Sequence, residues 1–193
     1  MLVGPLAGAI RADARTYPAI DLRIHEMAPD RQIALLESGQ TDVCFLRCPP
    51  PNADLIHERA EAETVRLVLP WRHRLVGAPV SLADLAGERF VFLRLADSPF
   101  ATYLWDRCVA AGFTPIVAQQ AVEAASLTSL VAAGLGIAII PEFVARLAHE
   151  DVIYAPLEGR PIRADVYAFW MRAKQPRIEN FVRLVQGGES AKS

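Results

Sequence analysis

The feature that most constrains the fold of this 193-residue chain is the regular alternation of helical and strand patterns along its length. The clearest stretch begins with the apolar run 89–93. It continues with Asp97-Ser98-Pro99, where capping residues precede a proline suited to the first turn of a helix. Short connections between alternating strands and helices are typical of an α/β fold, which we expect to contain mostly parallel sheets.

The same patterns assign the remaining elements. Strands are expected at 20–27, 42–47, 54–58, 63–70, 89–93, 116–122, 136–140, 152–157 and 162–171, and helices at 6–16, 29–38, 99–111, 124–133, 141–148 and 176–187. A one-turn helix is expected to start at 81–84, and residues 71–74 are expected to form a basic, exposed turn. The pattern starts afresh near 70–76, as if a second sheet were being built there.

The composition excludes several classes of protein. A hydrophobic content of 52% with 22% charged residues is typical of a globular domain, and no apolar run is long enough for a membrane-spanning helix. The net charge of −2 argues against nucleic-acid binding by this chain alone, because binding phosphates requires a net basic face. Three cysteines without a Cys-x-x-Cys pair predict free, mostly buried thiols in a reducing compartment, which we take to be the cytoplasm.

Nothing in the sequence indicates an enzyme. There is no Gly-x-Ser-x-Gly elbow and no phosphate-binding lysine loop, and the four histidines are scattered. We therefore predict no catalytic residue, no metal site and no cofactor.

Three strand-to-helix turns are candidate ligand sites, at 28–32, 94–100 and 123–128. A helix N-terminus offers free backbone N–H groups and the positive end of the helix dipole, so an organic acid is the expected ligand class. The alternative for Asp30 and Ser98 is that they only cap their helices. The hydroxyls of Ser126 and Thr128 are candidates for ligand contacts, and alternatively they bond back to their own helix.

Five segments, in this order and at these distances, carry a family resemblance: residues 17–18, 35–43, 81–85, 111–115 and 130–141. The last is Leu-Val-Ala-Ala-Gly-Leu-Gly-Ile-Ala-Ile-Ile-Pro and is the most specific. Together they resemble the C-terminal effector-binding domain of LysR-type transcriptional regulators, over about residues 5–185. The branch they resemble most senses aromatic acids or muconate.

The resemblance implies a type II periplasmic-binding-protein-like fold, with two Rossmann-like lobes and a ligand cleft between them. Lobe I is expected to comprise residues 1–70 and 158–193 and lobe II residues 71–157, with hinges near 69–71 and 154–157. The resemblance also implies a homodimer, a tetramer in the full-length parent, and DNA binding only through an N-terminal winged helix-turn-helix that this chain lacks. The first strand of lobe I is expected to be missing too, which leaves a possible gap in the ligand pocket.

Site residues follow from the same resemblance. Arg47 matches an arginine that contacts the effector carboxylate or a second binding site in the aromatic-acid sensors. Pro29 matches a position that often carries an effector-binding hydroxyl, a contact that proline does not supply. Further candidates are Ser98, Pro99 and Phe100 at the edge of the lobe II pocket, Arg94 (or its pairing with Asp97 instead), and Ser126.

Two alternatives to a ligand-sensing regulator share this expected fold. One is a solute-binding protein that feeds a transporter, for which a secretion signal is expected; the apolar N-terminus lacks the basic residues of one. The other is an enzyme with an acid or base in the cleft, for which the sequence offers no candidate.

Overall fold

The computed structural model describes residues 22–47, 55–147 and 149–174, together with 178, 179, 181 and 183. The chain divides into two compact units. The first comprises Met1–Ala62 and Asp165–Ser193, and the second comprises Glu63–Ala164. The lobe boundaries expected from the sequence stay a prediction.

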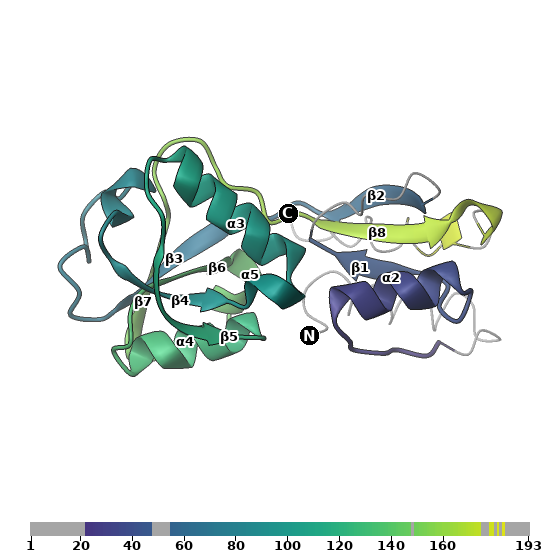
Figure 1. Cartoon of the computed structure of the whole chain (residues 1–193), viewed down its shortest axis with the longest axis horizontal. Helices are drawn as coiled ribbons and strands as arrows, with labels where there is room; N and C mark the ends of the chain where they lie inside the picture. The colour runs from purple at the N-terminus through teal and green to yellow at the C-terminus, as the bar shows by residue number, and fades with distance from the viewer. Residues whose placement is uncertain are drawn as a thin grey trace. The chain divides into compact units, whose positions relative to one another are not determined.

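The first unit contains a three-stranded antiparallel sheet in the order β1-β8-β2 (Figure 1). Its elements are α2 (Pro29–Glu37), β1 (Cys44–Leu46), β2 (Leu55–Glu61), β8 (Val166–Met171) and the 3-10 turn η3 (Arg172–Lys174). The central strand β8 alternates its fully buried rings between two clusters. Phe169 packs with Leu36 of α2, whereas Trp170 packs with Ala60 and Ile178. Helix α2 ends at Glu37 with Ser38 as its C-cap, and Gly39 follows with a φ of 73°, the left-handed value that glycine adopts without strain.

The second unit is built from alternating strands and helices. Its elements are β3 (Val65–Pro70), η1 (Ala83–Leu85), β4 (Arg89–Leu93), η2 (Leu95–Asp97), α3 (Pro99–Ala110), β5 (Ile116–Ala121), α4 (Ala124–Ala132), β6 (Ala138–Pro141), α5 (Glu142–Ala145) and β7 (Val152–Ala155).

Its strands run in the order β5-β4, then β6-β3-β7, and a parallel bridge between Phe90 and Ile137 links β4 to β6. Helices α3 and α4 lie on opposite sides of strands β4 and β5 (Figure 1). Strand β4 is buried from its second residue onward and β6 along its whole length, and both are correspondingly apolar there, whereas no residue of β5 is fully buried.

The expectation of mostly parallel sheets is wrong for the described strands. Only the strands that a helix separates, β4 and β5, form a parallel ladder, with the single bridge to β6 in the same sense. The other four ladders, β1–β8, β2–β8, β3–β6 and β3–β7, are antiparallel. The physical reason is connectivity: the strands of these four ladders, for example β2 and β8 or β3 and β7, are not consecutive in the chain, so no single crossover helix joins them in a parallel return.

The expected strand 20–27 is wrong over its described part. Residues 22–28 form neither strand nor helix, and Leu22 and Ile24 are 37% and 47% exposed. Alternating polarity marks a segment that suits a sheet edge, but a strand needs a neighbour for its ladder hydrogen bonds, and no described residue supplies one here. The expected helix 6–16 and most of 176–187 lie outside the described residues.

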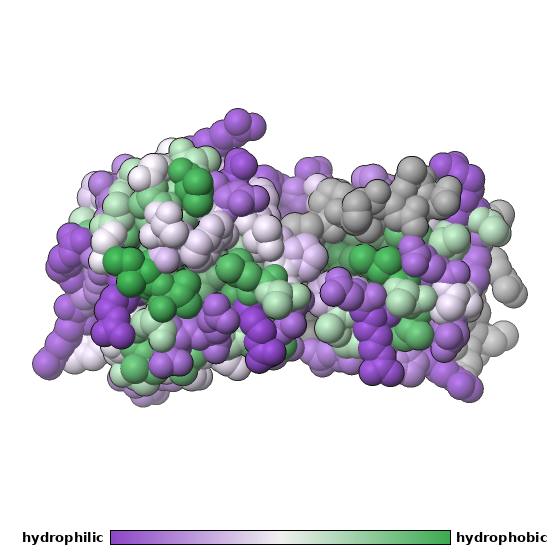
Figure 2. Space-filling model, viewed as in Figure 1, coloured by the Kyte–Doolittle hydropathy of each residue, from purple (hydrophilic) through white to green (hydrophobic). Residues whose placement is uncertain are grey.

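Several large apolar side chains of the second unit remain exposed. Val109, Ile116 and Val122 are each half-exposed, and Figure 2 shows hydrophobic residues gathered on the viewed face over this unit. Single exposed apolar residues are normal on a protein surface.

Candidate functional site

The N-terminus of α3 is closed by its own side chain. Ser98 is the N-cap, and its Oγ accepts a hydrogen bond of 3.2 Å from the Ala101 amide. Pro99 occupies the first turn, where its missing N–H costs nothing. Phe100 is 5% exposed and stacks on Tyr103, with ring centroids 6.1 Å apart, so its ring is part of the core. The capping reading of Ser98 is thus confirmed, and the ligand role of all three residues stays a prediction.

The two further candidates of the second unit, Arg94 and Ser126, follow the ends of the paired strands β4 and β5. The Arg94 amide, just after β4, donates a hydrogen bond of 2.9 Å to the carbonyl of Ala121 at the end of β5. Helix α4 starts two residues after Val122, with Glu123 as an N-cap that makes no side-chain cap bond and with exposed Ser126 in its first turns. The exposed Arg94 side chain pairs with Asp97 at 3.0 Å, the alternative that the sequence left open.

In the first unit, α2 begins without a side-chain cap. Its N-cap is Ala28, Pro29 follows at the first helical position, and Asp30 lies within the first turn rather than at the cap. The capping alternative for Asp30 is therefore wrong. Arg47 directly follows β1 and is half-buried. Pro29 and Arg47 belong to the first unit, and the other five candidates (Arg94, Ser98, Pro99, Phe100, Ser126) belong to the second.

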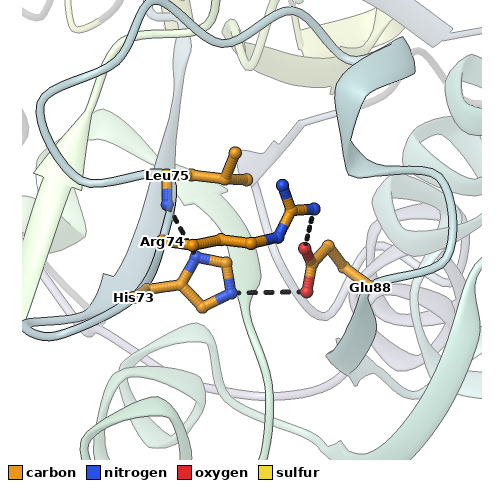
Figure 3. A network of polar contacts seen from close by, with 4 residues as sticks. All are labelled: His73, Arg74, Leu75 and Glu88. Atoms are coloured by element: carbon orange, nitrogen blue, oxygen red, sulfur yellow. Dashed lines mark hydrogen bonds and ion pairs between the residues drawn. The ribbon is translucent and has the colours of Figure 1, made fainter.

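A polar network that sequence reasoning missed ties the turn after β3 to the start of β4 (Figure 3). The Leu75 amide donates to Nδ1 of His73 at 3.3 Å, which leaves Nε2 of the ring to donate to Glu88 at 3.3 Å. Glu88 also pairs with Arg74. His73 is only 16% exposed at its side chain, so the expectation of an exposed turn at 71–74 is wrong for this residue. The sequence does show a histidine among arginines and a glutamate just before the next strand. The two residues are 15 positions apart, however, so the sequence alone does not indicate that they form a pair.

A second network fixes α5 to β3. The buried carboxylate of Glu63 accepts a hydrogen bond from the Phe143 amide at the start of α5, and Glu142 accepts from Thr64 at 3.0 Å and pairs with Arg66 at 2.5 Å. The Arg66 guanidinium holds the pKa of the Glu142 carboxyl below its usual value. Both carboxylates serve the fold, because every contact named here joins one element of the second unit to another.

The cysteine thiols are inert. Burial raises the pKa of Cys44 to about 12 and that of Cys108 to about 11, so both stay protonated at neutral pH. A protonated thiol is a poor nucleophile and a poor metal ligand. The prediction of free, buried thiols is confirmed for these two residues; Cys48 lies outside the described residues.

Among the described residues, no group of three or more His, Cys, Asp or Glu side chains is placed to hold a metal ion. No helix in the described ranges is long and apolar enough to cross a membrane.

The two α/β units, between which the chain crosses twice, have a type II periplasmic-binding-protein-like fold. The expected fold class is confirmed. The sequence profile described as LysR substrate binding domain matches residues 2–189, and the chain belongs to this family.

Relatives and solved structures agree with this assignment. The chain is 30% identical over 174 residues to the uncharacterized HTH-type transcriptional regulator YnfL of Escherichia coli K12. The aligned region covers 86% of this chain and 58% of YnfL. The structure of full-length CbnR complexed with its target DNA matches with a TM-score of 0.82 and 25% identity, over 97% of this chain and 66% of CbnR. The BenM effector binding domain with its effector benzoate matches with a TM-score of 0.82 over 98% of this chain and 89% of that domain; at 19% identity it shows the fold alone.

Proposed function

We propose that this chain is the effector-binding part of a bacterial LysR-type transcriptional regulator and that its effector is a small organic acid. Membership of the LysR substrate binding domain family supports the first half. The chain spans 58% of the length of YnfL, so DNA binding and transcriptional control belong, in this proposal, to a longer protein. The BenM domain, whose structure carries benzoate as its effector, supports an acid as the ligand class.

The observation that supports an acidic ligand is that two helix N-termini, those of α2 and α4, have no side-chain cap. At α2 the N-cap is Ala28, which has no acceptor, and at α4 the N-cap Glu123 makes no cap bond. The first N–H groups of a helix need an acceptor, and a carboxylate supplies one with the charge that the helix dipole favours. In α3, by contrast, Ser98 already supplies one acceptor.

The candidate residues divide into charged and neutral roles. Arg47 and Arg94 carry guanidinium forks that match the two oxygens of a carboxylate, and Arg94 would exchange Asp97 for the ligand. Ser98 and Ser126 supply hydroxyls, while Pro29, Pro99 and Phe100 supply surface without a side-chain donor.

The remaining expectations complete the proposal. The domain binds its ligand without transforming it and associates with further copies of itself. The ligand acts by favouring one arrangement of the oligomer over another, to the extent that it binds that arrangement better. The longer protein works in the cytoplasm, which the two reduced, buried cysteines support.

The experiment is thermal unfolding of the purified chain against benzoate, other aromatic acids and dicarboxylic acids, with neutral sugars as comparison. A binding acid at about 100 times its Kd stabilises the chain by about 2.7 kcal/mol, which is readily detected. We expect one acid class to raise the melting temperature, and Arg47→Met or Arg94→Met to weaken its binding at least tenfold.

The matched control is Arg160→Met, because Arg160 is an exposed arginine of the second unit outside the candidate turns. An effect of equal size in all three variants would mean only a change in net charge. A stabilising neutral sugar with no response to any acid would contradict the proposed ligand class.

A further inference from the structure

The second unit contains a cavity, half open to solvent, that is lined by none of the five residues of this unit used in the proposed function, although Ala125 and Thr128 of the candidate turn 123–128 do line it. Its volume is about 170 Å³, and it lies between α4, the end of α5 and the region of β7. This exceeds the space of about 10–15 Å³ that one water needs, so a small organic molecule fits into it. The lining residues are Ala125, Thr128, Ser129, Val144, Leu147, His149 and Tyr154.

Thr128 gives the cavity its chemistry. The residue is 6% exposed, and its Oγ1 has no hydrogen-bond partner in the described part of the chain. A threonine within a helix ordinarily bonds back to a carbonyl of the preceding turn, and this hydroxyl does not. A buried hydroxyl without a partner is unfavourable. Because the Oγ1 atom is itself closed off from solvent, the Thr128 side chain would turn toward the cavity to bond a group supplied there.

Three more polar groups line the same space. His149 accepts a hydrogen bond from the Asp151 amide at its Nδ1, 3.3 Å away, which leaves Nε2 as the ring's available donor. Tyr154 and Ser129 add hydroxyls. Opposite them Ala125, Val144 and Leu147 form an apolar wall. A few convergent polar groups against apolar side chains are typical of small-molecule sites.

The charge around the cavity selects the ligand class. None of the seven lining residues is lysine, arginine, aspartate or glutamate. The neighbouring charges are mixed, because exposed Arg146 precedes the lining residue Leu147 and exposed Glu150 and Asp151 follow His149. An uncharged lining with more acidic than basic neighbours disfavours an anion.

We propose that this cavity, whose buried Thr128 hydroxyl lacks a partner, is a second ligand site that takes a small uncharged molecule with hydroxyl or amide groups. The ligand accepts from Nε2 of His149, exchanges hydrogen bonds with Thr128 and Tyr154, and packs its carbon atoms on Val144 and Leu147. The site lies on the same helix, α4, whose start is proposed to receive the organic acid, but it uses none of the side chains assigned to the acid, such as Arg47, Arg94 and Ser126.

The test is a titration of the chain, labelled at its alanine, valine and leucine methyl groups, with 1,2-propanediol and acetamide, followed by NMR. We expect saturable shifts at Ala125, Val144 and Leu147. Acetate is the charged comparison and should bind more weakly.

Thr128→Val keeps the side-chain shape and removes the hydroxyl. We expect it to weaken binding at least fivefold while leaving the melting temperature unchanged or higher, because the variant buries no unpaired group. Tyr154→Phe should weaken binding as well. The matched control is Thr102→Val, an exposed threonine of α3, which should change neither quantity.

Three outcomes overturn the proposal. One is the absence of saturable shifts at the three methyl groups with either probe, which means that the cavity holds only water. Another is unchanged binding in Thr128→Val. The third is tighter binding of acetate than of the neutral probes. None of them bears on the organic-acid site, whose test uses Arg47 and Arg94.

Discussion

Both units contain small sheets, but the chain connects the strands of the two units differently. In the second unit neighbouring strands are separated by helices, so β4, α3 and β5 follow each other in sequence and in space. In the first unit the central strand β8 comes from the far end of the chain and pairs with β1 and β2, more than a hundred residues earlier. The difference teaches that the order of elements in the sequence predicts sheet direction only where a helix joins the two strands.

The helix N-termini differ as well, with α3 capped and both α2 and α4 without a side-chain cap. Helix α3 of the second unit carries its own cap in Ser98, whereas α2 of the first unit starts from Ala28 without one. A cap that the helix supplies stabilises the free protein, and an open N-terminus leaves its N–H groups for a ligand.

The largest expected effect separates the stabilities of the two units. Phe169→Ala removes a fully buried ring that packs with Leu36 in the first unit. It should cost the first unit about 4 kcal/mol, the usual range for such a deletion. Hydrogen exchange followed by mass spectrometry should show lost protection in β1, β2 and β8 and retained protection in β4 to β6. Equal loss in both units would show that they unfold as one.

The next substitution adds a side-chain atom instead of removing a ring, and it lies in the second unit. Gly136 has a φ of 152°, and an added Cβ there would press on the Arg89 carbonyl oxygen of β4. Gly136→Ala should cost about 3 kcal/mol, since strain and a backbone displacement add. The loss should appear in β4 and β6 by the same exchange measurement.

Gly87→Ala is the matched control for Gly136→Ala. Gly87 also has a positive φ, 85°, but a Cβ there meets nothing within 4 Å. Only the backbone conformation is penalised, by about 1 kcal/mol. If both substitutions lower the free energy of unfolding by the same amount, the contact with the Arg89 carbonyl oxygen does not contribute to the destabilisation by Gly136→Ala.

Two substitutions test the helix caps, one by removing the cap of α3 and the other by adding a cap to α2. Ser98→Ala should destabilise the second unit by about 1 kcal/mol, and Ala28→Ser should stabilise the first by a similar or smaller amount, because it creates a cap at α2. Urea unfolding of both variants measures these changes. A gain in Ala28→Ser accompanied by weaker acid binding would place the ligand at that helix start, and an unchanged stability would show that α2 is already satisfied.

The smallest effect depends on pH. The pKa of Glu142 is lowered in the folded chain, first by its hydrogen bond from Arg66, so its contribution to stability is present above the usual carboxyl pKa and is lost as the pH falls through the lowered value. Because the pair is partly exposed, Glu142→Gln should cost only about 0.5 kcal/mol at pH 7. The difference from the parent chain should shrink as the pH falls below the usual carboxyl pKa of about 4.3 and vanish below the lowered value. Denaturation of both chains across this range checks it, and a difference that persists at the lowest pH would contradict it.

Local signals predicted the second unit well. Ser98-Pro99 set the start of α3, and the strand 89–93 has the expected bounds. The mixed directions of the sheets and the loss of the strand at 20–27 could not be predicted, because both depend on which distant strand supplies hydrogen bonds. Thr128 had been singled out only as a hydroxyl that contacts a ligand or its own helix. Its lack of a helix bond and its place beside His149 and Tyr154 emerge only from tertiary packing.

The central position of β8 has a consequence for synthesis of the protein on the ribosome. About a hundred residues separate the end of β2 from the start of β8, which at about 5–20 residues per second delays the pairing of β1 and β2 by several seconds. The second unit, which lies wholly within that interval, emerges with all its strands before the first unit receives its middle one. During this delay β1 and β2 remain unpaired strand edges, and nascent-chain aggregation and chaperone binding should concentrate there rather than in the second unit.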